Sequence, residues 1–383
     1  MIERSVGTDP EVTRPQIDLG ARPILVFWEV TRACLLACRH CRASAIPEPL
    51  PGELSTEEGK RFLESLTSFG RPYPVVVLTG GDVLMRPDLL RLATLAGELG
   101  LPVAISPSVT PRLEHETLSA LRQTGVKVAS LSLDGASAET HEGLRCVKGH
   151  FEATLDALRL LRTHGFTAQV NTVVRPENVE ELPQIAAIVD EVGASIWEVF
   201  FLVRVGRGAQ LPELSPEESE DVCHFLVDAS RYGFIVRTVE APFFRRVVTW
   251  RREGRDFETG PLYNRLVERL YSLLGEPRLE PRAQTKGTRD GKGIVFVSHN
   301  GEVFPAGFLP LAIGNVRDES LVRIYRESPL LQAIRAASFR GRCGICDYAD
   351  LCGGLRARAY AASGDPLAED PACVYAPSTS PRP

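Results

Sequence analysis

The sequence predicts an α/β fold: a partial (β/α)6 barrel of the TIM type, followed by a smaller domain. Between residues 24 and 230, short apolar runs alternate six times with longer amphipathic stretches. Alternation of this kind is typical of a parallel sheet covered by helices. Further along, two apolar runs meet at Asn300-Gly301, which is a strong signal for a β-hairpin. A complete eight-fold barrel usually needs about 250 residues, so six repeats predict an open barrel.

The predicted strands are the apolar runs at 24–30, 75–79, 103–106, 128–133, 168–174 and 196–203. The stretch between the first two is helical, because Ser55 and Glu58 form a capping box and Gly70 is a suitable stop. The segments "SAETHEGL", "FEATLDALRLLRTHG" and "NVEELPQIAAIVDEVG" follow the same helical pattern. Parallel strands end at one rim, so we expect functional residues in the loops there.

The chain divides into five predicted parts. These are an N-terminal arm at 1–21, the barrel at 22–240, a helical linker and loop at 241–292, the small domain at 293–375 and a disordered tail at 376–383. The linker prediction comes from a helical pattern at 260–274 followed by a polar stretch. The tail "APSTSPRP" has the composition of a disordered end.

Composition narrows the class of protein. A chain of 383 residues with 44% hydrophobic residues can bury a large core. The net charge of −5 gives no basic field that would recruit nucleic acid. The sequence shows no signal peptide and no apolar segment long enough for a bilayer, so we expect a cytoplasmic protein without a membrane partner. Thiols stay reduced there, and grouped cysteines then indicate metal rather than disulfides.

Three cysteines, Cys34, Cys38 and Cys41, lie in the stretch "WEVTRACLLACRHCRAS" at the spacing C-x3-C-x2-C. Disulfides pair an even number of thiols, and a structural zinc site normally closes with four ligands. The spacing instead fits an iron–sulfur cluster that leaves one iron open to a ligand that is not protein. The first cysteine follows Val30, at the predicted rim of the barrel. A partial zinc site and a chance grouping are the alternatives.

This motif resembles the signature of the radical S-adenosylmethionine (radical SAM) superfamily, in which an aromatic residue often precedes the third cysteine; here that residue is His40. The resemblance implies a [4Fe–4S] cluster whose open iron chelates S-adenosylmethionine (SAM). In that family one electron from the reduced cluster cleaves SAM to a 5′-deoxyadenosyl radical, which abstracts hydrogen from a substrate. The expected activity is therefore that of a radical SAM oxidoreductase, with flavodoxin or ferredoxin as its electron donor.

The resemblance also implies contacts to SAM at the rim. In "VVVLTGGD", Gly80, Gly81 and Asp82 stand where the family has Gly-Gly-Glu, which receives the ammonium group of SAM. Glycines suit a place where backbone approaches a ligand closely. Asp82 is one methylene shorter than the usual glutamate. An ordinary turn is the alternative interpretation of the two glycines.

Three later segments complete the set of cofactor contacts that the resemblance implies. Ser132 and Arg145 belong to a "SLDG…H…R" pattern, in which serine hydrogen-bonds SAM and arginine grips its carboxylate. Asn171 would contact the ribose, and Leu202, with its neighbour Val203, would pack against adenine. The structural alternatives are a solvated helix-end arginine, a buried strand-end amide and two apolar core residues.

A second group, Cys343, Cys346, Cys352 and Cys373, has the spacing C-x2-C-x5-C-x20-C. Four thiolates bind either zinc or an iron–sulfur cluster, and the residues alone do not separate the two. After a hairpin of the type "NGEVFPAG", the group resembles the SPASM extension of many radical SAM enzymes, which implies an auxiliary [4Fe–4S] cluster. Two-cluster SPASM domains have a further cysteine at the hairpin end, where this chain has Pro305-Ala306-Gly307. We therefore predict one auxiliary cluster and two clusters in all.

The segment "GGLRARAYAASGDPLAEDP" resembles the radical enzymes of heme d1 formation and of the siroheme-derived heme pathway. This implies a tetrapyrrole whose side chain is decarboxylated or removed. Propionate partners, or else a solvated basic face, are predicted at Arg204, Arg207, Arg237, Arg245 and Arg246. A radical maturase of a ribosomal peptide and a non-catalytic iron–sulfur or zinc protein are the alternatives.

The two remaining cysteines, Cys146 and Cys223, have no partner at a ligand spacing. A free cysteine is among the most frequently buried residue types. We therefore predict that both are small buried residues with no part in either metal site.

Overall fold

The computed structural model describes residues 17–277, 279–283 and 287–377. Most of the predicted N-terminal arm and most of the predicted disordered tail lie outside these ranges. Within the described ranges, no helix is both long enough and apolar enough to cross a membrane.

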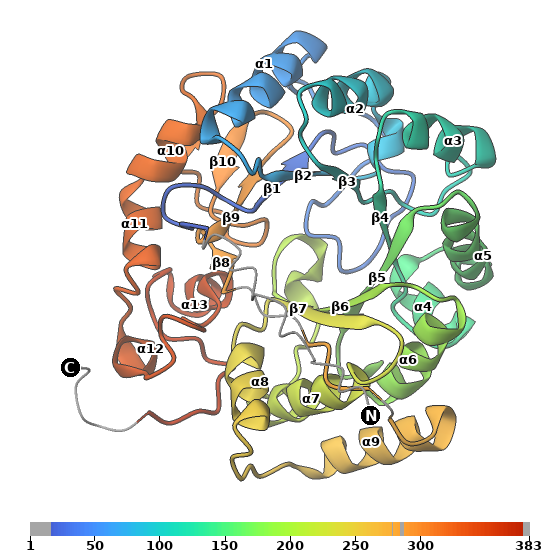
Figure 1. Cartoon of the computed structure of the whole chain (residues 1–383), viewed down its shortest axis with the longest axis vertical. Helices are drawn as coiled ribbons and strands as arrows, with labels where there is room; N and C mark the ends of the chain where they lie inside the picture. Colours follow the sequence, from blue (N-terminus) through green and yellow to red (C-terminus); the bar gives the residue numbers. More distant parts are fainter. Residues whose placement is uncertain (1–16, 278, 284–286, 378–383) are drawn as a thin grey trace, which may run out of the picture.

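All strands belong to one eleven-stranded sheet with the order β11-β10-β9-β1-β2-β3-β4-β5-β6-β7, and β8 pairs with β9. Strands β1 to β7 are parallel neighbours. The strands are β1 Leu25–Glu29, β2 Val75–Thr79, β3 Val103–Ile105, β4 Val128–Ser132, β5 Thr167–Val174, β6 Ile196–Phe201, β7 Ile235–Val239, β8 Arg289–Asp290, β9 Gly293–Val297, β10 Glu302–Phe304 and β11 Gly314–Asn315. The parallel strands curve around an interior that the helices surround from outside (Figure 1).

The α-helices are α1 Thr56–Leu66, α2 Leu89–Glu98, α3 His115–Gln123, α4 Ala138–Arg145, α5 His150–Thr163, α6 Leu182–Glu191, α7 Pro216–Ala229, α8 Phe244–Arg252, α9 Pro261–Leu274, α10 Leu321–Glu327, α11 Pro329–Arg335, α12 Gly341–Ile345 and α13 Arg356–Ser363. Short 3-10 turns lie at Thr67–Phe69, Val83–Met85, Val179–Glu181 and Gly206–Gln210. The capping box at the start of α1 is present in both directions, as predicted.

The core holds the sheet and the outer helices together. Trp28 of β1 is fully buried and meets Phe62 of α1 edge to face, with ring centroids 5.1 Å apart. Gly59 of α1 lies directly over the same indole, where a Cβ would come within 2.8 Å of it. Burying one large apolar side chain contributes about 1.5–3 kcal/mol, so this contact fixes α1 against the first strand and thereby the loop that follows the strand.

The open barrel is confirmed, with one strand more than predicted. The six predicted strands are all present and differ by at most two residues at their ends. The seventh, β7, was missed because Arg237 and Thr238 interrupt its apolar run. These residues lie on a strand whose neighbour β6 also carries a polar residue, Glu198, in register with Arg237. The barrel interior is therefore partly polar near this edge.

The predicted hairpin is confirmed and has a further role. Strands β9 and β10 are antiparallel, and Gly301 in the turn has a φ of 88°, a conformation that favours glycine. Strand β9 also pairs in parallel with β1, in the register Leu25↔Ile294. The hairpin thus continues the sheet of the barrel. The domain boundaries stay a prediction.

Candidate active site

The loop after β1 brings the first three cysteines together. Cys34, Cys38 and Cys41 pack in one small group with Leu36 and Ala45. Cys34 and Cys38 are buried and Cys41 is half-buried. The loop closes on itself because Cys34 N donates to the Ile46 carbonyl at 2.8 Å. The spacing read from the sequence therefore corresponds to one cluster of thiols at the C-terminal rim of the barrel.

Arg207 fixes this loop from the segment after β6. Its Nε donates to the Cys38 carbonyl at 2.9 Å and its Nη1 donates to the Ala45 carbonyl at 2.7 Å. Its own backbone N–H donates to the Cys41 carbonyl at 3.0 Å. These bonds hold two of the cysteines from a distant part of the chain, a role that no local sequence pattern showed.

The three thiols have surroundings that suit an iron–sulfur cluster. Backbone N–H groups point at sulfur: Leu36 N lies 3.3 Å from Cys34 Sγ and Ala45 N lies 3.5 Å from Cys41 Sγ. Burial raises the pKa of Cys34 and of Cys38, so a bound metal would have to displace their protons. Among the described residues no three ligand-type side chains are arranged to hold a single metal ion.

The Gly80–Asp82 segment lies directly against the cysteine loop. Gly81 N donates to the Thr31 carbonyl at 2.9 Å, and Asp82 N donates to the Ala33 carbonyl at 2.7 Å. A Cβ at Gly80 would stand 2.4 Å from the Thr31 oxygen, and one at Gly81 would stand 2.3 Å from the Ala33 oxygen. The glycines are required here by the chain's own loop, in addition to any approach of SAM.

Asp82 is engaged within the protein. Its side chain has no exposed surface, and burial raises its pKa. Oδ1 accepts from Leu84 N at 3.1 Å and from Ser108 N at 3.2 Å, while Oδ2 accepts from the Thr110 hydroxyl at 3.0 Å. The carboxylate therefore joins the ends of β2 and β3. Its predicted contact with the ammonium group of SAM stays a prediction.

Arg145 lies beside the second cysteine and is buried, so it is not a solvated helix-end residue. Its Nη2 lies 2.5 Å from Asp134 Oδ2, and its Nη1 donates toward Cys38 Sγ at 3.7 Å. Asp134 is held by Val173 N at 2.8 Å. The positive charge of Arg145 opposes the effect of burial on the pKa of Cys38. This places a fixed guanidinium at the edge of the thiol group.

Ser132, the last residue of β4, is in register with Asn171 in the middle of β5. Gln169 Nε2 donates to Asn171 Oδ1 at 2.8 Å and to Glu198 Oε2 at 2.9 Å. Asn171 is therefore part of a row of polar side chains on β5 and β6, which the sequence pattern did not show.

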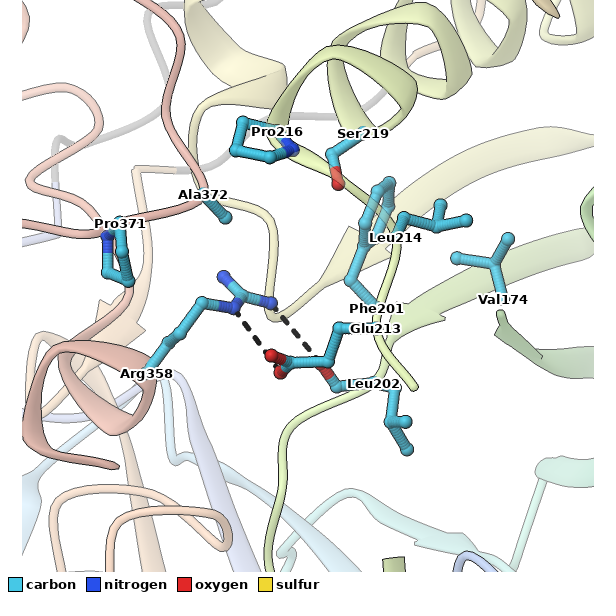
Figure 2. Close-up of a pocket in the computed structure, with 10 residues that line it drawn as sticks. All are labelled: Val174, Phe201, Leu202, Glu213, Leu214, Pro216, Ser219, Arg358, Pro371 and Ala372. Carbon is cyan, nitrogen blue, oxygen red and sulfur yellow. Dashed lines mark hydrogen bonds and ion pairs between the residues drawn. The ribbon is translucent and has the colours of Figure 1, made fainter. Parts of the chain in front are cut away.

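Leu202 follows β6 and packs with Leu144 and Leu211 in a buried apolar group. Its carbonyl accepts from Arg358 Nη2 at 3.4 Å. Figure 2 shows Arg358 reaching from α13 across a pocket toward Glu213, and Leu202 lies on the same side of the pocket as Glu213. The predicted adenine contact therefore lies where the barrel meets the C-terminal segment.

Comparison with known proteins identifies the family. The chain is 37% identical over 359 residues to a protein named AdoMet-dependent heme synthase from Methanosarcina barkeri, covering 93% of this chain and 97% of that protein. The sequence profile of the radical SAM superfamily matches residues 28–189. The chain belongs to the radical SAM superfamily. It is therefore an enzyme with a [4Fe–4S] cluster and SAM as cofactors.

Two further comparisons agree with this family. A second Methanosarcina barkeri protein, named Fe-coproporphyrin III synthase, is 32% identical and covers 94% of this chain and 89% of its own length. The fold matches that of Streptococcus suis SuiB bound to S-adenosylmethionine, with a TM-score of 0.67, 14% identity, and coverage of 93% of this chain and 78% of SuiB.

The four later cysteines of this radical SAM enzyme line one pocket, together with Arg342, Ala349, Gly353, Gly354, Asp370 and Tyr375. Backbone N–H groups again point at sulfur: Tyr348 N at Cys346, Gly354 N at Cys352 and Asp370 N at Cys343, at 3.4 to 3.5 Å. Burial raises the pKa of Cys352 to about 12 and that of Cys373 to about 11. A Cβ at Gly354 would stand 2.9 Å from Cys343 Sγ.

Some predictions need correction. Four of the five arginines expected to pair with propionates have partners within the protein: Arg207 binds the cysteine loop, Arg246 pairs with Glu220 at 2.6 Å, Arg204 lies 3.8 Å from Glu213, and Arg245 binds backbone carbonyls. Cys146 is exposed at the end of α4, so its predicted burial is wrong.

Cys223 is fully buried as predicted. It lies near enough to Cys352 and Cys373 for the charges of those thiolates to raise its pKa further, after burial as the main cause. Ser108, whose hydroxyl lies 3.6 Å from Cys34 Sγ, was missed. Its position in the loop after the third strand, at the same rim as the cysteines, is the signal that could have identified it.

Proposed function

We propose that this radical SAM enzyme oxidatively decarboxylates propionate side chains of an iron tetrapyrrole and leaves vinyl groups. The observation that carries the proposal is the similarity to a heme synthase along nearly the whole length of both chains. Heme has two vinyl groups at positions where coproporphyrin has propionates. Fe-coproporphyrin III, which appears in the name of the second relative, is therefore the proposed substrate.

In this proposal Cys34, Cys38 and Cys41 hold the catalytic cluster, whose electron cleaves SAM to methionine and the 5′-deoxyadenosyl radical. The residues proposed to position SAM are the backbone of Gly80 and Gly81, the Asp82 segment, Ser132, Arg145, Asn171 and Leu202. Arg145 would place a fixed positive charge at the cofactor's carboxylate, since its guanidinium is already oriented by Asp134. The apolar group around Leu202 would keep water from the radical.

We further propose that Cys343, Cys346, Cys352 and Cys373 hold an auxiliary [4Fe–4S] cluster rather than zinc. Zinc also binds four thiolates; the cluster is proposed because the chain belongs to the radical SAM superfamily and its four later thiols line one pocket. N–H groups directed at sulfur are also a feature that tunes iron–sulfur clusters.

The decarboxylation needs an electron acceptor. Abstraction of a hydrogen atom from the ring-attached carbon of a propionate leaves a carbon radical. Breaking the bond between the outer methylene and the carboxylate carbon then releases CO2, forms the vinyl double bond and sets one electron free. The auxiliary cluster is the proposed acceptor, and flavodoxin or ferredoxin the proposed partner for electron exchange.

The test is an anaerobic assay with reconstituted enzyme, dithionite, SAM and Fe-coproporphyrin III. We expect heme, with the mass loss of two CO2 and four hydrogen atoms, and two molecules of 5′-deoxyadenosine for each heme. Deoxyadenosine formation that the porphyrin does not stimulate, but that a candidate peptide does, would favour the peptide maturase instead. Mass spectrometry of both products separates the two outcomes.

A further inference from the structure

Three arginines around the four later cysteines have no carboxylate partner. Arg356 is completely buried, Arg289 is 4% exposed, and Arg245 is half-buried. Their hydrogen bonds go to backbone carbonyls, and among the described residues no carboxylate lies within 4.0 Å of them. By contrast, two buried arginines nearby are paired, Arg246 with Glu220 and Arg358 with Asp370.

These three arginines reach the cysteine group or its loop from three separate elements. Arg356 of α13 donates toward Cys343 Sγ at 3.8 Å. Arg289 of β8 donates to the carbonyls of residues 349 and 350, at 3.1 and 2.9 Å. Arg245 of α8 donates to the carbonyl of residue 351 at 3.3 Å. The last two therefore hold the loop between Cys346 and Cys352, so that each guanidinium lies close to a sulfur ligand.

A buried positive charge without a partner costs several kcal/mol. The Asp290 carboxylate lowers this cost for Arg245 and Arg356, and the Asp350 carboxylate lowers it for Arg289, each from beyond 4.0 Å. A nearer anion would compensate these charges more strongly. Four thiolates around a [4Fe–4S] core form a group that is doubly negative when oxidised and triply negative when reduced. Nearby positive charge stabilises the more negative state more strongly, so this shell favours the reduced cluster.

We propose that Arg245, Arg289 and Arg356 raise the reduction potential of the auxiliary cluster, so that the cluster can take the electron released during decarboxylation. The inference rests on the auxiliary cluster of the proposed function. In the step, the C–C bond to the carboxylate breaks, CO2 leaves and one electron passes to the oxidised cluster. The cluster then returns that electron to a redox partner of the flavodoxin or ferredoxin class.

The test is a redox titration followed by electron paramagnetic resonance. It is done in the Cys38→Ala background, where only the auxiliary cluster would contribute a signal. We expect Arg289→Met and Arg356→Met each to reduce the equilibrium constant for electron uptake at least tenfold, which is a fall of 59 mV for one electron. Arg340→Met is the matched control. Its side chain is 72% exposed and pairs with Asp365 at 2.6 Å, so we expect a much smaller fall.

The iron content of the Cys38→Ala parent is read first. About four irons per chain are expected for one [4Fe–4S] cluster, and their absence would overturn the auxiliary cluster itself. If the irons are present and the potential of both Met variants equals that of the control, the arginine proposal is wrong. If a Met variant fails to bind iron, Arg289→Lys and Arg356→Lys decide. They keep the charge, so a potential near that of the parent supports the proposal and a tenfold loss overturns it.

Discussion

At the scale of single residues, charged side chains at the barrel rim fix the loops there. Arg207 binds the cysteine loop, and Asp82 joins the loops after β2 and β3. Asp82 accepts three hydrogen bonds from two loops and has no exposed surface. Asparagine can accept the two backbone N–H bonds, whereas alanine leaves them without a partner. An unsatisfied buried donor costs about 1–3 kcal/mol.

We therefore expect Asp82→Asn to keep its affinity for SAM within about threefold, a difference below 1.4 kcal/mol. Asp82→Ala should lower the melting temperature of the anaerobically purified protein. Isothermal titration with SAM and a thermal scan measure the two effects. A tenfold loss of affinity in Asp82→Asn would instead show that the carboxylate receives the ammonium group.

Cys38 provides the residue-scale test of the catalytic cluster. Cys38→Ala should abolish 5′-deoxyadenosine formation, because two thiolates cannot hold the cluster. Reconstituted wild type should contain about eight irons per chain and the variant about four. Cys146→Ala is the control, since Cys146 is exposed and lies outside both cysteine groups. Equal iron contents in wild type and Cys38→Ala would contradict the assignment.

At the scale of elements, the strands and caps with strong local signals could be predicted and the long-range contacts could not. Ser55 and Glu58 form a local capping box, and Asn300-Gly301 is a local turn, so three to four residues contain the whole signal. Strand β7 was missed because Arg237 interrupts its apolar run. Its partner in register, Glu198 on β6, is found only once the neighbouring strand is known. Arg207 binds a loop that precedes it by more than 160 residues, beyond the reach of any pattern.

The Gly80-Gly81 turn is an element whose geometry makes a sharp prediction. A Cβ at Gly81 would stand 2.3 Å from the Ala33 oxygen, which is backbone and has no room to yield without moving the cysteine loop. We expect Gly81→Ala to lower both the iron content and the rate of SAM cleavage at least tenfold. The control is Gly143→Ala on α4, where no atom lies within 4 Å of the new Cβ. Alanine there should stabilise the helix by up to about 1 kcal/mol.

At the scale of the whole molecule, the first strand joins the cysteine loop to the C-terminal hairpin. Glu29 at the end of β1 accepts from Arg42 Nη2 at 2.9 Å and lies 3.0 Å from His299 Nδ1. Burial would raise the pKa of Glu29, but the bonds from His299 and Arg42 outweigh it and lower the pKa. One carboxylate thus joins the cysteine loop to the turn between β9 and β10.

Because the folded-state pKa of Glu29 is lower than its unfolded value, its contribution to stability is present above about pH 4.3 and is lost as pH falls further. Glu29→Gln should therefore destabilise the protein at pH 7 by about 1.5–3 kcal/mol, the range for hydrogen bonds to charged groups. The difference from wild type should shrink below pH 4. Thermal scans across this pH range test it, and a difference that grows in acid would contradict the assigned sign.

The last prediction concerns the separate roles proposed for the two cysteine groups. The first group lies at the end of β1 and the second in the C-terminal segment, held by α12 and the loop before α13. Cleavage of SAM needs only the first. Cys343→Ala should therefore lose about four irons, keep substrate-independent formation of 5′-deoxyadenosine within twofold, and fail to complete heme, because the electron from the substrate has no acceptor.

Elemental analysis and product analysis of the same anaerobic preparation make this prediction decisive. Cys146→Ala serves again as the control for the loss of one thiol. Zinc in the wild type, with full iron content in Cys343→Ala, would show a structural metal site and remove its redox role. Loss of the four irons with undiminished heme formation would confirm the auxiliary cluster but show that it is not the electron acceptor.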